Sequence, residues 1–250
     1  MRYRLPMRKR VGPSDLKRIY DRLLDRQGHS AWWPGESAFE VCLGAILTQN
    51  TAWTNVEKAL AALKAEGLLS YEALRLLPLS RLTELIRPSG TYKVKATRVA
   101  AFLDFLGREY GGRVEAMAGE EPSELRHKLL SVFGIGPETA DAIALYAAGQ
   151  PLFVVDAYTR RVFGRLGLLR GDELYADVQR FFMDRLPSDA ALFQDYHAQI
   201  VRLAKDVCRP VPRCDVCALH GVCATVQRRE RRARRARRAR RGLQSVGGAR

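Results

Sequence analysis

The sequence lacks the apolar segments that would send a chain into or across a membrane. Its Arg-rich opening, Met1–Arg10, is followed by no apolar core segment, so we expect no secretory signal. No apolar run elsewhere is long enough to span a bilayer. We therefore expect a soluble, intracellular protein of the cytoplasm with no membrane partner.

Acidic residues are few: 27 Asp and Glu stand against 42 Lys and Arg, which gives a formal net charge of +15. The excess is uneven, because ten Arg and one Glu between Arg228 and Arg241 supply +9 and leave +6 for the rest. A basic balance favours an anionic partner, and nucleic acid, an anionic membrane and mere solubility all remain open.

The C-terminal region repeats Arg-Arg-Ala and has few residues that could form a core. Because it cannot bury a core, we predict an Arg-rich disordered tail over 224–250. Its use would be a non-specific, salt-dependent attraction to nucleic acid, unless composition alone explains it.

Cysteine is scarce except in one stretch near the C-terminus, where four of the five follow the pattern C-x5-C-x2-C-x5-C. Disulfides are rare inside cells, so this spacing favours metal binding. Structural zinc usually shows two C-x2-C pairs, and this stretch has one. A compact run of four thiolates with intervening Pro and basic residues fits a [4Fe–4S] cluster better. The predicted ligands are Cys208, Cys214, Cys217 and Cys223.

Apolar residues recur at helical spacing along most of the chain, which predicts an all-α protein. With 250 residues, 47% of them hydrophobic, the chain can form one large or two small domains. Ser14 is the expected N-cap of the first helix, and Cys42 is expected in a core. Further helices are expected over 39–47, 55–63, 95–106, 158–166 and 192–205 and from residue 122, with a loop over 107–119.

The central motif is Gly134-Ile135-Gly136, with helical patterns on both sides and Pro137 suited to a first helical position. Two glycines around one aliphatic residue let backbone N–H groups point outward at the start of the second helix, where they can bind phosphate. Alone, the motif predicts no more than a helix–helix turn. Asp156, placed just beyond the second helix, favours a functional site.

Phe133–Gly136, Thr139–Asp141 and Val155-Asp156 together resemble the helix-hairpin-helix (HhH-GPD) DNA glycosylases of the endonuclease III superfamily. The resemblance implies a two-lobed fold with a C-terminal iron–sulfur cluster loop, acting as a monomer on double-stranded DNA with damaged bases. It also implies a base-excision DNA repair enzyme in which Asp156 drives cleavage of the N-glycosidic bond. The implied DNA-binding residues are Gln49, Gly134, Ile135, Gly136 and Thr139, with Gln49 entering the base stack.

One position departs from endonuclease III. Its nucleophilic Lys lies two residues after the second hairpin glycine, where this chain has Glu138. No Schiff base can form at a carboxylate, so we do not expect lyase activity there. Lys93 and Lys95 are the nearest candidates for a substitute amine.

Three further segments look like the MagIII-type 3-methyladenine DNA glycosylases: Ala31–Pro34, Gly44–Thr51 and Arg87–Gly90. This resemblance implies release of alkylated purines, which are cationic and attracted to aromatic faces. A hydrophobic plug between domains would also explain the tryptophans. The implied base-pocket residues are Trp33 and Trp53, flanking the flipped base, with Trp32 as support and Gln199 where that branch has Lys. Glu138 is a further candidate for the pocket, as a second polar group beside Asp156, and an exposed helix residue is the alternative.

Asp156 has two interpretations that are compatible. It precedes a predicted helix, as an N-cap does. A carboxylate near a sugar can also stabilise the positive charge that builds on the anomeric carbon as a base leaves, and can orient the attacking water.

We expect a basic arm over 1–13, a lobe made of 14–34 and 150–207, a lobe over 35–149 that contains the hairpin, the cluster loop over 208–223, and the tail. The predicted function is that of a monofunctional DNA glycosylase. The alternatives are a bifunctional glycosylase/AP lyase acting on oxidised pyrimidines and a non-catalytic protein that binds damaged DNA.

Overall fold

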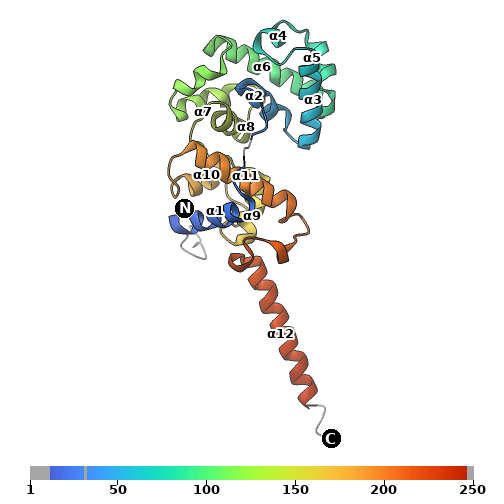
Figure 1. The fold of residues 1–250 in the computed structure, drawn as a ribbon, viewed down its shortest axis with the longest axis vertical. Coiled ribbons are helices and arrows are strands. Elements are labelled where there is room, and N and C mark those ends of the chain that lie inside the picture. The colour runs from blue at the N-terminus through green and yellow to red at the C-terminus, as the bar shows by residue number, and fades with distance from the viewer. Residues whose placement is uncertain (1–11, 31–32, 247–250) are drawn as a thin grey trace, which may run out of the picture. The chain divides into compact units, whose positions relative to one another are not determined.

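The computed structural model describes residues 12–30 and 33–246, with side chains through residue 236. These residues form helices and short helical turns and contain no strand, which confirms the all-α prediction (Figure 1). Within the same residues, no helix is both long enough and apolar enough to cross a membrane. The α-helices are α1 (Pro13–Gln27), α2 (Ala38–Leu47), α3 (Trp53–Ala65), α4 (Tyr71–Leu76), α5 (Leu79–Leu85), α6 (Tyr92–Tyr110), α7 (Pro122–Ser131), α8 (Pro137–Ala142), α9 (Ala157–Leu166), α10 (Tyr175–Met183), α11 (Ala190–Asp206) and α12 (Ala224–Val246).

The chain divides into two compact units. Unit 1 consists of residues 1–30, 155–186 and 196–250, and unit 2 consists of residues 31–154 and 187–195. The first turns of α11 belong to unit 2, where the sequence placed them in the other lobe. The reason is local: Phe193 packs 5.5 Å from Phe153, and the Gln194 amide donates to the Leu145 carbonyl at 2.7 Å.

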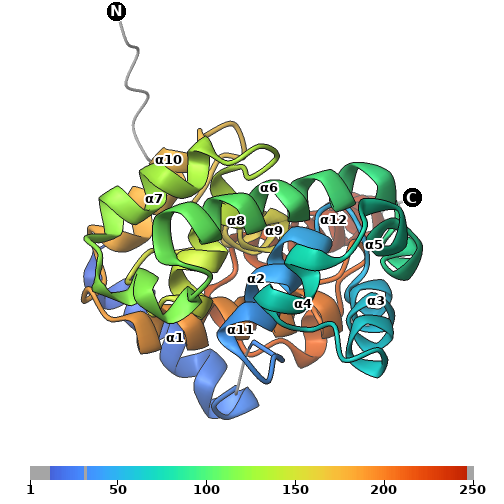
Figure 2. The ribbon, with the colours of Figure 1, turned by 90° about the horizontal axis from the view of Figure 1, so that it is seen from above.

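Unit 2 is built around α2, whose residues from Phe39 to Leu47 are all buried. Ser37 caps this helix, since its hydroxyl accepts from the Glu40 N–H at 3.1 Å. The long helix α6 packs against α2 and α5 (Figure 2). Cys42 lies fully buried in α2, and this burial raises the pKa of its thiol, so it is the core residue that the sequence predicts.

Unit 1 is held together by the apolar stripe of α1 and by aromatic side chains. Leu16 and Leu23 are fully buried, and the Tyr196 hydroxyl donates to the Leu16 carbonyl at 2.9 Å. Phe163 of α9 and Phe182 of α10 pack edge to face at 4.7 Å. Helix α1 begins two residues earlier than predicted, because Pro13 occupies its first position and Gly12, not Ser14, is the N-cap.

Two further sequence predictions are wrong. The tail predicted to be disordered is helical over Ala224–Val246, because Arg and Ala are both strong helix formers and Val226 is buried in the first turn. The predicted loop over 107–119 is partly helical, since α6 continues to Tyr110 and a 3₁₀ helix covers Val114–Gly119. Residues 1–11 of the predicted basic arm lie outside the described residues.

Candidate functional site

Asp156 is the N-cap of α9 and lies in unit 1. One carboxylate oxygen accepts from the Thr159 N–H at 2.7 Å and from the Thr159 hydroxyl at 2.8 Å. The other lies 3.5 Å from Nε2 of His197. The Asp156 side chain is 13% exposed, so one edge of a fixed carboxylate is open to a ligand.

The pKa of Asp156 is set by opposing effects. Burial alone would raise it, but the hydrogen bond and charge of His197 and the two bonds from Thr159 lower it below the usual value. Asp156 is therefore ionised at neutral pH. His197 was missed as a partner of Asp156, because it lies 41 residues further along the chain and no local pattern joins the two.

The glycine hairpin joins α7 to α8 in unit 2. Gly134 has φ +80, a left-handed conformation that favours glycine, and a Cβ on it would lie 2.3 Å from Cγ of Arg98. Gly136 is the N-cap of α8, with Pro137 at the first helical position as predicted. Ile135 is 5% exposed, so its side chain anchors the turn rather than reaching outward.

Below the hairpin, Asp141 of α8 is fully buried and forms an ion pair with Arg126 of α7 at 2.7 Å. This pair fixes one helix of the hairpin against the other. Breaking a buried pair on one side is expensive, because a charge is left without compensation. The geometry of the turn is therefore set by the two helices as well as by its glycines.

Gln49 is brought directly to the hairpin. Its amide nitrogen donates to the Gly134 carbonyl at 3.0 Å and to the Thr139 hydroxyl at 2.9 Å, and its carbonyl accepts from Arg98. Three residues predicted to bind DNA, Gln49, Gly134 and Thr139, thus form one network. Entry of Gln49 into a base stack would require it to leave these bonds, and this role stays a prediction.

The aromatic residues of unit 2 also gather, but not in the arrangement that the resemblance implies. Trp33 and Trp53 meet edge to face with centroids 5.3 Å apart and planes at 90°, and Tyr146 lies 5.2 Å from Trp33. Gly44 of α2 lies beneath both tryptophans, where a Cβ would approach Trp33 Nε1 to 3.2 Å. A base could stack between the two tryptophans only if one ring moved. Trp32 lies outside the described residues.

The other two predicted pocket residues belong to different units. Glu138 is exposed in the first turn of α8 in unit 2. Gln199 is fully buried in α11 of unit 1, and its amide nitrogen donates to the Gly28 carbonyl at the end of α1 at 2.6 Å. This amide joins α11 to α1, and a role in reading the base stays a prediction.

Lys95 is 1% exposed in unit 2. Its ammonium nitrogen donates to the Leu47 carbonyl at 2.8 Å and to the Ser89 carbonyl at 2.6 Å. Burial, with a smaller effect from Arg98, lowers its pKa to about 8. The side chain therefore fixes the backbone just before Gln49 and does not face solvent, whereas Lys93 is exposed.

The four cysteines of the C-terminal stretch are half-buried and not in disulfides. Burial raises the pKa of Cys217, and the thiols of Cys208, Cys223 and Cys214 raise it further. The four thiols are thus close enough to interact. In the described residues, however, no three metal-ligating side chains come together as a metal site.

Arg165 connects α9 to this stretch. Its guanidinium donates to Sγ of Cys208 at 3.3 Å and to the carbonyls of Arg209 and Pro210 at 2.6 and 2.9 Å. Sγ of Cys223 lies 3.4 Å from the Arg165 carbonyl, to which it donates. A soft four-thiol donor set, in which a guanidinium donates to the sulfur of Cys208, is chemically suited to an iron–sulfur cluster.

Comparison with known proteins relates the chain to DNA repair proteins. Residues 43–188 match the HhH-GPD superfamily of base excision DNA repair proteins. A protein of Methanocaldococcus jannaschii, provisionally described as a DNA repair glycosylase, is 44% identical over 82% of this chain and 94% of its own length. Endonuclease III of Thermotoga maritima is 29% identical over 76% of this chain and 84% of its own length.

Solved structures show the same fold. An endonuclease III–DNA complex superposes with a TM-score of 0.75 at 22% identity, covering 88% of this chain and 99% of the other. The 3-methyladenine DNA glycosylase MagIII of H. pylori, bound to 1,N6-ethenoadenine, superposes with a TM-score of 0.67 at 29% identity, covering 78% of this chain and 98% of the other.

Proposed function

The chain belongs to the HhH-GPD superfamily of base excision DNA repair proteins, and we propose that it is a monofunctional DNA glycosylase that releases alkylated purines. The observation that carries the chemistry is Asp156, an ionised carboxylate held by Thr159 and His197. A fixed negative charge stabilises the positive sugar that forms as the base departs, and it can orient the attacking water. A methylated purine is already cationic, so one carboxylate suffices without a strong general acid.

Two positions support base release without strand cleavage. They are Glu138, beside the hairpin, and Lys95, in α6. Glu138 occupies the position of the lyase nucleophile and cannot form a Schiff base. Lys95 has a lowered pKa, as a reactive amine would, but it is buried and its nitrogen bonds to two backbone carbonyls. Lys93, in contrast, is exposed on α6, and borohydride treatment tests whether it acts as a substitute amine.

The aromatic group of unit 2 supports a cationic purine as substrate. Trp33 and Trp53 offer ring faces and edges beside Gly44, with Tyr146 against Trp33, and a positively charged base is attracted to such faces by about 2 kcal/mol or more when desolvated. MagIII of H. pylori, which was solved with 1,N6-ethenoadenine bound, shows that a relative of this fold accommodates a modified adenine. The hairpin would hold the DNA backbone, with the backbone N–H groups of Gly134 and Gly136 as donors to phosphate, while the Ile135 N–H donates to the Val132 carbonyl at 3.1 Å.

We further propose that Cys208, Cys214, Cys217 and Cys223 hold a [4Fe–4S] cluster. Its chemistry would be structural: four Fe–S bonds would cross-link the stretch. The purified protein should be brown with broad visible absorption and should contain iron and sulfide. The double variant Cys214→Ser with Cys217→Ser should lose the colour together with the iron and sulfide. Colourless protein that is folded, active and free of iron and sulfide after anaerobic purification would contradict this assignment.

The substrate class is tested by single-turnover base release from duplexes that carry 3-methyladenine, hypoxanthine, ethenoadenine or an oxidised pyrimidine. We expect release of an alkylated purine, an intact abasic strand, and no protein–DNA adduct after borohydride treatment. Release of the oxidised pyrimidine with strand cleavage would identify a bifunctional enzyme. Tight binding without release from any duplex would identify a damage-binding protein.

A further inference from the structure

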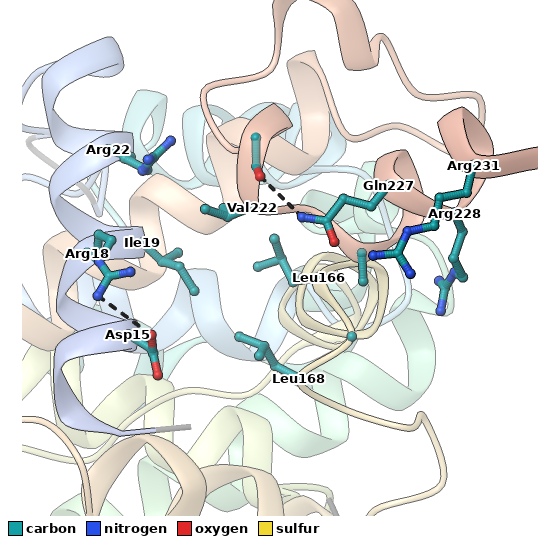
Figure 3. Close-up of a pocket in the computed structure, with 13 residues that line it drawn as sticks. Asp15, Arg18, Ile19, Arg22, Leu166, Leu168, Val222, Gln227, Arg228 and Arg231 are labelled. Atoms are coloured by element: carbon teal, nitrogen blue, oxygen red, sulfur yellow. Dashed lines mark hydrogen bonds and ion pairs between the residues drawn. The ribbon is translucent and has the colours of Figure 1, made fainter. Parts of the chain in front are cut away.

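Unit 1 contains a cavity of about 540 Å³ whose lining includes neither Asp156 and His197 nor any of the four cysteines of the cluster loop. It lies where α1, the end of α9 and the start of α12 meet (Figure 3). Arg18 and Arg22 of α1 line one side, and Arg228 and Arg231 of α12 line the other. Four guanidinium groups from segments about 200 residues apart thus share one cavity.

The positive charge of this cavity is largely uncompensated. Asp15 is its one lining carboxylate, and it lies 3.8 Å from Arg18. Among the described residues, Arg22 and Arg231 have no ion-pair partner. Like charges gathered around one hollow repel each other, so an anion bound there lowers the energy of the folded unit.

The floor of the cavity is apolar. Ile19 and Leu166 are buried, and Leu168 and Val222 are half-buried beside them, between the two arginine pairs (Figure 3). An apolar floor lowers the local dielectric and strengthens the attraction of the arginines for an anion. It also offers contact area to a ligand that has an apolar body as well as negative charge.

We propose that this cavity binds phosphate groups of a nucleic-acid strand, at a site separate from Asp156 and the hairpin. Guanidinium groups bind phosphate oxygens in a bidentate geometry, and the volume suits a nucleotide-sized segment. Arg234 continues the three-residue spacing of Arg228 and Arg231, about 4.5 Å further along α12. This row of arginines extends along α12 beyond the cavity, so it suits the successive phosphates of a strand better than a single free phosphate.

The experiment measures binding of an undamaged, single-stranded, fluorescent oligodeoxynucleotide by anisotropy at several salt concentrations. The test variant is Arg22→Gln with Arg231→Gln. The matched control is Arg26→Gln with Arg232→Gln, which removes two exposed charges from the same two helices outside the cavity. Circular dichroism establishes that both variants are folded.

The test variant should bind about 10-fold more weakly, with a salt slope lower by about 1.4, as expected for two lost phosphate contacts on a single strand. The control should lose markedly less. Equal losses in the two variants would overturn the proposal, because the charge of the helices alone would then explain binding. So would unchanged binding in the test variant.

A free phosphate compound shares the chemistry of a strand and is tested separately by calorimetry with inorganic pyrophosphate. Stoichiometric pyrophosphate binding that the test variant lacks, with strand binding unchanged, would overturn the assignment to a strand. Base release from a saturating damaged duplex should be equal in wild type and test variant. Failure of this inference is thus distinguishable from failure of the glycosylase proposal.

Discussion

Asp156 combines two functions in one residue: it caps α9 and it presents an ionised carboxylate. The sequence alone predicted both, because Asp followed by a helical pattern is visible in the chain. It could not predict His197, whose contact with Asp156 arises from the packing of α9 and α11 within unit 1. That contact makes the chemistry of Asp156 depend on a second titratable residue.

His197→Gln should shift the pH profile of base release. His197 lowers the pKa of Asp156, so its replacement raises that pKa. In the proposed mechanism ionised Asp156 is the active form, so the rate should fall as pH drops through its pKa, and the acid limb of the variant should lie at higher pH than that of wild type. Single-turnover rates between about pH 3 and pH 7 measure this, because that range extends to both sides of the ordinary Asp pKa of about 3.9.

The matched control is His127→Gln, which changes an exposed histidine of α7 in the other unit. Its acid limb should coincide with that of wild type. An acid limb that stays in place in His197→Gln would mean that His197 supports the fold without influencing Asp156.

At the scale of elements, the sequence predicted those helices whose apolar stripe is regular and long. It identified α2, α9 and α11 to within about two residues at most ends. It gave no prediction for α4, α5 and α10, because six- to nine-residue helices contribute only one or two apolar turns. The contact of Gln49 with the hairpin could not be predicted either, since 85 residues separate it from Gly134.

The hairpin gives a sharp contrast between its two glycines. Gly134→Ala should destabilise the protein by about 1 to 3 kcal/mol, because φ is +80 and the new Cβ would strike Arg98, which also bonds to Gln49. Duplex binding should weaken as well, since the turn presents its amides to phosphate. Urea unfolding and duplex binding measure the two effects.

Gly136→Ala serves as the control for stability. Gly136 has φ −92, and a Cβ on it would meet no atom within 4 Å, so its replacement should cost under about 1 kcal/mol. Equal costs at the two glycines would contradict the geometry of the hairpin.

At the scale of the whole molecule, the sequence predicted the class of fold but misplaced its boundaries. Two units form from interleaved segments, and α11 contributes to both. The division within α11 depends on Phe193 and Gln194 packing in unit 2, which no composition or periodicity reveals. The helical α12 was missed because low-complexity sequence was equated with disorder, although its residues favour helix.

The central claim is that Asp156 cleaves the N-glycosidic bond, and the most direct measurement compares Asp156→Asn with Asp189→Asn. Both residues are N-caps, since Asp189 accepts from the Leu192 N–H at 3.1 Å, and Asn preserves capping in each variant. Single-turnover release of 3-methyladenine from a saturating duplex should fall by at least about 100-fold in Asp156→Asn, because the charge on the transition state loses its partner. It should be unchanged in Asp189→Asn. Equal rates in both variants would contradict the account and would assign Asp156 to capping alone.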